Sequence, residues 1–127
     1  MTKSSKQKGD AFERELAAHI NGKTGLSCFR APLSGGGHGL GFSTADILGT
    51  PMLHVEAKRV ERLNFYEAIE QAERSINRTK SQDMPIVINR RNGMKTGDSV
   101  VALRLDDFLG FYAYYLRAKG YVDKPDQ

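Results

Sequence analysis

The chain has 127 residues, of which 39% are hydrophobic and 27% charged, a composition typical of a single globular domain spanning residues 1–127. Its one cysteine, Cys28, excludes an internal disulfide and, with only three histidines, the usual Cys/His zinc spacings. The net charge of +4 is a modest cationic bias, and no apolar run is long enough to span a membrane. We therefore expect a cytoplasmic protein with no membrane partner.

The N-terminal part is predicted to hold a basic segment and one amphipathic helix. Residues 1–8 carry three lysines ahead of any acid, and we expect them to form a flexible basic arm. Over residues 9–22 apolar side chains recur every four positions, which predicts a helix. Asp10 is its expected cap, and Gly22 its expected end.

Strands and one permissive loop follow this helix. Residues 27–32 are typical of a short strand, and five glycines between residues 35 and 41 predict a loop. Two further strands are expected over residues 44–50 and 51–60, joined tightly around residues 49–51. If they pair as a hairpin, Asp46 lies within about one position of facing Val55 or Glu56.

The second half continues this alternation of helices and strands. Asn64 and Glu67 have the spacing of a capping box at the start of the second helix. The elements expected here are a helix at 64–80, a strand at 84–90, a hairpin turn at 91–98, a strand at 99–105, a helix at 106–120 capped by Asp106, and a loose tail at 121–127. The resulting order, α-β-β-β-α-β-β-α, predicts an α/β fold with a mixed five-stranded sheet flanked by helices.

Three acids stand at unusual positions. Glu13 falls at the edge of the apolar stripe of its helix, although Asp10 and Glu13 also have capping-box spacing. Asp46 interrupts an apolar strand, where it caps a turn or serves chemistry. In the strand over residues 51–60, Glu56 alternates with apolar neighbours and shares one face with Lys58.

These acids admit two interpretations. A charged, solvent-facing strand face explains Glu56 and Lys58 without any ligand. Carboxylates that meet on one face repel each other, however, and a hard divalent cation with oxygen ligands is the usual answer.

Five short motifs lie in the first two thirds of the chain: GDAFEREL at 9–16, RAPLSGGG at 30–37, TADILG at 44–49, HVEAKR at 54–59 and QA at 71–72. In this order they resemble the PD-(D/E)xK nuclease superfamily, in particular the archaeal-type Holliday junction resolvases and their phage counterparts. Thr44-Ala45 departs from the pattern, in which a proline often precedes the acid, and the segment after residue 90 matches no subfamily. The resemblance implies a restriction-endonuclease-like core.

The resemblance also implies a metal site. Asp46, Glu56 and the carbonyl of Ala57 would bind Mg²⁺, for which Mn²⁺ is an expected substitute, and Glu13 would complete the site directly or through water. Lys58 would orient the attacking water, and Gln71 would hold the lysine or the water. An exposed helix glutamine is the alternative for Gln71.

Basic and loop residues are the expected DNA contacts. The glycine-rich loop would cradle phosphate oxygens, or it is only a connection between strands. The residues assigned to DNA binding are Lys3, Lys6, Lys8, Arg30, Ser34, Gly35, Arg59 and Arg62. The histidines His19, His38 and His54 receive no role, and Tyr112, Tyr114 and Tyr115 are expected in the core or at an interface.

The leading hypothesis is a Mg²⁺-dependent, structure-selective DNA endonuclease that resolves four-way junctions as a homodimer. A different DNA nuclease of the same fold, acting on nicks, flaps or repair intermediates, is one alternative. A protein of the same fold that binds branched or duplex DNA without cutting it is another.

Overall fold

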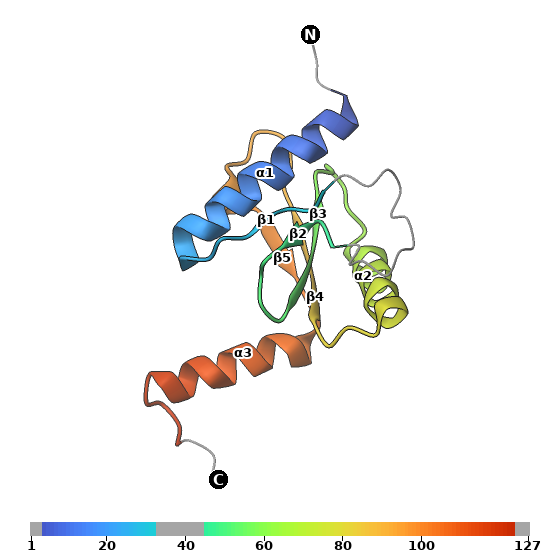
Figure 1. The fold of residues 1–127 in the computed structure, drawn as a ribbon. Helices are drawn as coiled ribbons and strands as arrows, with labels where there is room; N and C mark the ends of the chain where they lie inside the picture. Colours follow the sequence, from blue (N-terminus) through green and yellow to red (C-terminus); the bar gives the residue numbers. More distant parts are fainter. Residues whose placement is uncertain (1–3, 33–44, 124–127) are drawn as a thin grey trace.

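The computed structural model describes residues 4–32 and 45–123 (Figure 1). Its elements follow the predicted order, with one short 3-10 helix added. They are α1 (Ser5–Thr24), β1 (Phe29–Arg30), β2 (Ile47–Leu48), β3 (Leu53–Lys58), α2 (Phe65–Thr79), β4 (Met84–Asn89), η1 (Thr96–Asp98), β5 (Val100–Ala102) and α3 (Leu105–Ala118).

The five strands form one mixed sheet in the order β1-β2-β3-β4-β5. β3 and β4 are parallel along their whole length, and α2 makes the crossover between them. The other neighbours are antiparallel, and the β2–β3 pairing places Ile47 opposite Val55. The predicted α/β class and mixed five-stranded sheet are therefore confirmed.

Helices α1 and α2 pack on opposite faces of this sheet. Phe12 and Leu16 of α1 are buried in a cluster with Val55 and other residues of the central strands. On the other face, residues of α2 pack around Val87, which is fully buried. Because strand side chains alternate between faces, Glu56 and Lys58 lie on the α2 side of the sheet.

The ends of α1 differ from the prediction. The helix begins at Ser5, where Ser4 and Gln7 form a reciprocal capping box, so residues 5–8 are helical and not a flexible arm. Asp10 lies inside the helix and is not its cap. Gly22 also lies inside the helix, which ends at Thr24 because Gly25 adopts the left-handed conformation, with φ of 81°.

The turn between β2 and β3 lies where the sequence predicts it. Gly49 has φ of 84°, and the backbone N–H of Leu53 donates to the Thr50 carbonyl at 3.1 Å. A Cβ atom at Gly49 would lie 3.0 Å from the Cα of Cys28. Both the left-handed backbone and this close approach require glycine.

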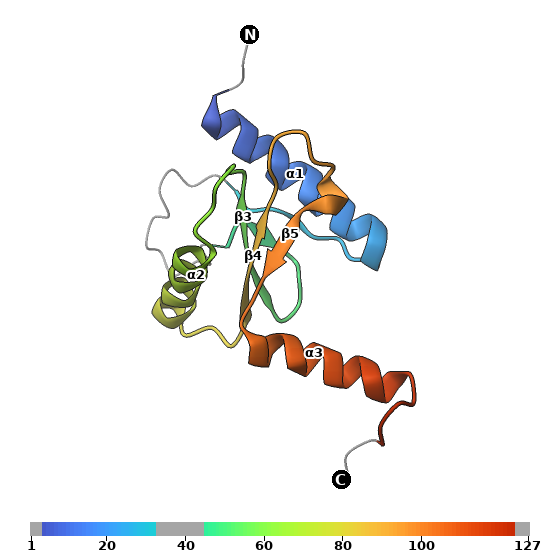
Figure 2. The ribbon, with the colours of Figure 1, turned by 180° about the vertical axis from the view of Figure 1, so that it is seen from behind.

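Helix α3 departs from the prediction most. It extends from the end of β5 away from the sheet (Figures 1 and 2), and none of its residues is buried. The tyrosines Tyr112, Tyr114 and Tyr115 are therefore exposed and do not belong to the core. The helix begins at Leu105 after Arg104, so Asp106 lies in its first turn and is not the cap.

Among the residues that the structure describes, no helix combines the length and the apolar character needed to cross a bilayer.

Candidate functional site

Asp46 and Glu56 meet on the face of the sheet that α2 covers. Ile47 pairs with Val55 and faces the α1 core, so its neighbour Asp46 points to the opposite face. The backbone N–H of Ala57 donates to Asp46 Oδ2 at 2.8 Å, and the Glu56 carboxyl lies near enough to raise the pKa of Asp46. The hairpin thus brings together the two acids, as its predicted register requires.

This carboxyl pair holds a proton at unusually high pH. Burial raises the pKa of Asp46 to about 8, and the nearby charge of Glu56 acts in the same direction, while the Ala57 N–H opposes it. The charge of Glu13 contributes a smaller increase to the pKa. Near neutral pH the Asp46 carboxyl is therefore mostly protonated in the absence of a cation.

Glu13 is held by an arginine at the margin of this pair. Arg30 Nε lies 2.7 Å from Glu13 Oε1, and a second guanidinium nitrogen lies 2.6 Å from Asp10 Oδ1. Two carboxylates of α1 therefore engage the guanidinium that the sequence suggested for DNA. Because Ser4 and Gln7 form the capping box, Glu13 has no capping role.

His54 is a neighbour of the site that sequence reasoning left unassigned. Its side chain is buried on the same strand face as Glu56, and Nε2 lies 2.9 Å from Glu56 Oε1. With a proton on Nε2, the ring donates to this carboxylate and fixes its orientation. The period of two along β3 was the available signal, because it places residues 54 and 56 on one face.

Lys58 and Gln71 are in contact, as the resemblance implied. Lys58 Nζ donates to Gln71 Oε1 at 3.3 Å, which connects the end of β3 to the middle of α2. The buried Asn89 exchanges hydrogen bonds of 3.0 and 2.9 Å with the backbone of Val60. These bonds fix the chain just beyond Lys58.

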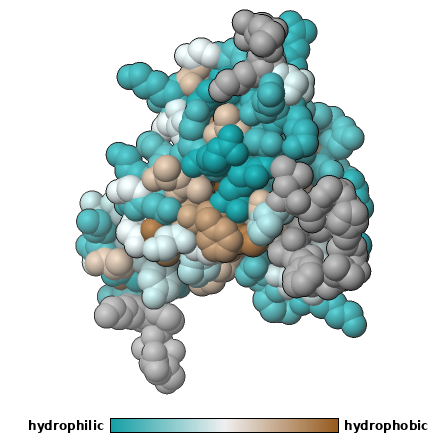
Figure 3. Space-filling view, turned by 45° about the horizontal axis from the view of Figure 1, so that its top comes forward, coloured by the Kyte–Doolittle hydropathy of each residue, from teal (hydrophilic) through white to brown (hydrophobic). Residues whose placement is uncertain are grey.

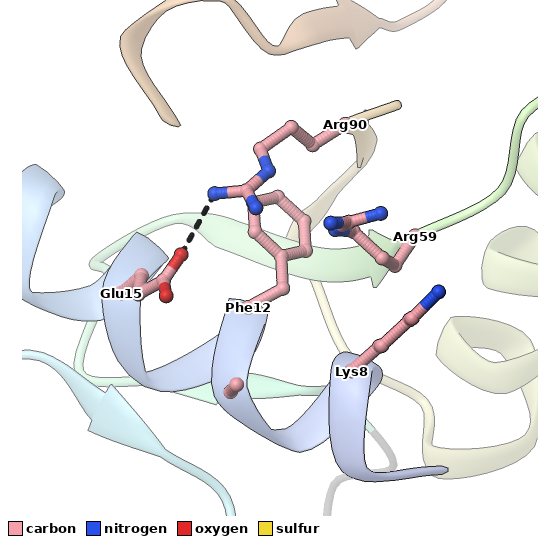
Figure 4. Close-up of a pocket in the computed structure, with 6 residues that line it drawn as sticks. Lys8, Phe12, Glu15, Arg59 and Arg90 are labelled. Carbon is pink, nitrogen blue, oxygen red and sulfur yellow. Dashed lines mark hydrogen bonds and ion pairs between the residues drawn. The ribbon is translucent and has the colours of Figure 1, made fainter. Parts of the chain in front are cut away.

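A basic pocket lies beside the ends of the parallel strands (Figure 4). Its volume is about 150 Å³, and its lining combines Lys8, Phe12 and Glu15 of α1 with Arg59 and Arg90. Arg90 donates to Glu15 at 2.7 Å and lies over the Phe12 ring, 5.5 Å from its centroid. Three cationic side chains and one acidic side chain thus line the same pocket.

The remaining predicted DNA contacts are less organised. Lys6 is exposed and forms an ion pair with Asp10 at 3.2 Å, and Arg62 is exposed after β3. Lys3, Ser34 and Gly35, together with the rest of the glycine-rich loop, lie outside the described residues. The face shown in Figure 3 is largely hydrophilic in its upper part and has an apolar patch near the middle.

Within residues 4–32 and 45–123, no group of three or more histidine, cysteine or acidic side chains is arranged to hold a metal ion. Comparison of the chain with protein-family models, curated proteins and solved structures gives no match. What the protein does must therefore be inferred from the contacts of its own side chains.

Proposed function

We propose that this protein is a divalent-metal-dependent DNA endonuclease with a restriction-endonuclease-like core. The observation that carries the proposal is the buried pair of Asp46 and Glu56, in which burial and mutual repulsion raise the pKa of Asp46 to about 8. Such a pair is unfavourable unless protons or a cation neutralise it. Acids with strongly perturbed pKa values are typical of functional sites.

The donor set suits a hard cation such as Mg²⁺ or Mn²⁺. Asp46 and Glu56 would supply carboxylate oxygens, Ala57 its carbonyl oxygen, and Glu13 a further carboxylate through water. When bound, a divalent cation would supply Lewis acidity and a water of lowered pKa for phosphodiester hydrolysis. The ion pair with Arg30 explains why Glu13 is assigned to the outer position.

The other side chains would position the reactants. Lys58, held by Gln71, would orient the attacking water and stabilise the charge that develops on the phosphate. His54 would keep Glu56 in the orientation that ligation needs. The pocket of Lys8, Arg59 and Arg90 would hold a neighbouring phosphate of the same strand.

Four-way DNA junctions are the proposed substrate, cut by two copies of the chain. A junction has two-fold symmetry, and an enzyme that makes two symmetric cuts is most simply a two-fold dimer. The clustering of cations on one side of α1 and near the ends of β3 and β4 favours a nucleic acid over an uncharged substrate.

A cleavage assay on a panel of DNAs tests this proposal. Purified protein is incubated with four-way junctions, flaps, nicked duplex and linear duplex, each with Mg²⁺ and with chelator. We expect metal-dependent cutting that is strongest on the junction. Equal cutting of every DNA would reject the resolvase and indicate a nuclease without selectivity for junctions.

Asp46→Asn is the decisive variant, because the amide retains the shape of the carboxylate and removes its charge. We expect at least a hundredfold loss of cleavage, on the scale of a removed transition-state contact. Asp83→Asn, a change at an exposed acid before β4, is the matched control and should leave cleavage unchanged. If the unmodified protein and Asp46→Asn bind DNA and neither cuts it, the protein is a binding module.

A further inference from the structure

Helix α3 presents an apolar surface that nothing in the described chain covers. Leu105 is 69% exposed and Tyr115 56% exposed, and none of the fourteen helix residues is buried. Phe108 and Tyr112 stack on each other, with ring centroids 5.9 Å apart, and still lie open to solvent. Monomeric proteins seldom expose an apolar patch of this extent without a partner for it.

The apolar side chains form one broad stripe. At 100° per residue they occupy an arc of roughly 200°. The stripe is formed by Leu105, Phe108, Leu109, Phe111, Tyr112, Ala113, Tyr115 and Leu116. Tyr114 lies outside the stripe, on the opposite side of the helix.

Two opposite charges lie on the same border of this stripe. Asp106 and Arg117 differ by roughly 20° around the helix axis, yet they stand in its first and last turns. Neither side chain belongs to an ion pair within the described part of the chain. The border of the stripe is therefore negative at one end and positive at the other.

We infer that α3 is the surface through which two copies of this chain associate, with their α3 helices antiparallel. A two-fold axis perpendicular to the plane of two antiparallel helices keeps equivalent borders on the same side. Asp106 then faces Arg117 of the partner subunit, and the same contact occurs again at the other end. Pairing also sets the two helix dipoles in opposite directions, which is favourable.

The extent of the apolar surface fits a second copy. A helix of this length is about 21 Å long and roughly 10 Å wide, so two such stripes alone stay below the roughly 1,000 Å² that a specific interface buries. Val100 and Val101 of β5 are about half exposed, and Tyr121 and Val122 are exposed just after α3. Exposed apolar side chains therefore also lie before and after α3, where a second copy can reach them.

Measurement of mass in solution tests the inference. The full chain is examined by sedimentation equilibrium at about 1 to 100 μM, a range that resolves dimers of micromolar affinity. We expect twice the chain mass of 14.1 kDa, and Leu109→Glu, in the middle of the stripe, should give single chains. A single-chain mass for the unmodified protein throughout would overturn the inference.

Two serine substitutions distinguish the stripe from the rest of the helix. Tyr112→Ser should weaken association at least tenfold, whereas Tyr114→Ser, outside the stripe, should leave it unchanged. Both tyrosines are exposed on α3, so neither change disturbs the core, and circular dichroism verifies that the helix is retained. Equal effects of the two changes would contradict the assigned face.

Charge reversal tests the antiparallel geometry itself. Asp106→Arg places two cations opposite each other at both ends of the pair, and Arg117→Asp places two anions there. Each variant alone should associate about tenfold more weakly, while an equimolar mixture of the two should recover association, because every facing pair is again of opposite sign. Failure of the mixture to recover would exclude this pairing.

The inference is independent of the proposed nuclease activity. A dimer with no cleavage of any DNA would refute only the proposed function. A monomer that cuts DNA would refute the inference from α3 and the two-fold cutting of junctions, and would leave the metal-dependent nuclease activity standing.

Discussion

Ionisation of Asp46 is unfavourable when the site holds no cation. Its pKa is about 8 in the folded protein against 3.8 for a free aspartate side chain. Between these values the folded state binds more protons than the unfolded state, so the free energy of unfolding falls as pH rises. The stabilisation that the proton on Asp46 provides is present below pH 4 and lost as pH passes about 8.

Removing this charge should stabilise the metal-free protein. In Asp46→Asn the amide oxygen still accepts from the Ala57 N–H, and its NH₂ group donates to Glu56. At pH 8.5 with chelator, we expect the free energy of unfolding of the variant to exceed that of the unmodified protein by about 2 kcal/mol. At pH 4.5 the difference should nearly vanish.

Denaturant unfolding at both pH values, with and without Mg²⁺, measures this effect. Added Mg²⁺ should stabilise the unmodified protein through binding to the folded state and should not stabilise Asp46→Asn. If the free energy of unfolding depended on pH identically in the two proteins, ionisation of Asp46 would not destabilise the fold.

The positions of single residues were predictable where the chain itself carried a pattern. Asp46 and Glu56 meet because alternation along two paired strands determines which side chains share a face, and that alternation is visible in the sequence. The ion pair of Glu13 with Arg30 was not predictable. It depends on how α1 lies across β1, a tertiary arrangement without any local signal.

At the scale of elements, the turn between β2 and β3 depends on Gly49. Substitution by alanine would impose a left-handed backbone on a residue with a side chain and push its Cβ against Cys28, 3.0 Å from the Cα. We expect Gly49→Ala to lower the free energy of unfolding by about 3 kcal/mol.

Gly93→Ala is the matched control for this effect. Gly93 has a similar φ of 78°, but a Cβ there meets no atom within 4 Å. Gly93→Ala should lower the free energy of unfolding by only about 1 kcal/mol, because it strains the backbone conformation and nothing else. Equal losses in chemical denaturation would show that the approach to Cys28 does not matter.

Helix α2 and strands β3 and β4 agree with the prediction because period and capping indicate the same elements. The side chain of Asn64 accepts from the Glu67 N–H at the start of α2, as the capping spacing indicated. The extent of α1 was misjudged because the Ser4 cap was overlooked. The burial of α3 was misjudged because a stripe of apolar residues does not specify what covers it.

For the whole molecule, the distribution of charge matters more than the net value of +4. If the basic pocket contacts a phosphate, Arg59→Ala and Lys8→Ala should each weaken junction binding in the presence of chelator. Each should also reduce the slope of log affinity against log salt concentration by about 0.9.

Lys23→Ala serves as the control for this prediction. Lys23 is an exposed cation of the same helix, about four turns from Lys8. Fluorescence anisotropy at several salt concentrations measures the slopes. If Lys23→Ala weakened junction binding as much as Lys8→Ala does, the basic pocket would have no special part in binding.

The position of β3 inside the sheet has a consequence for local opening of the fold. β3 is bounded by β2 and β4, and its ladder with β4 runs through all six residues. Amide protons of Glu56 and its strand neighbours should therefore exchange with solvent only when the whole fold opens. α3 contributes no buried residue, so in a single chain it can unwind without opening the strand that carries the acids.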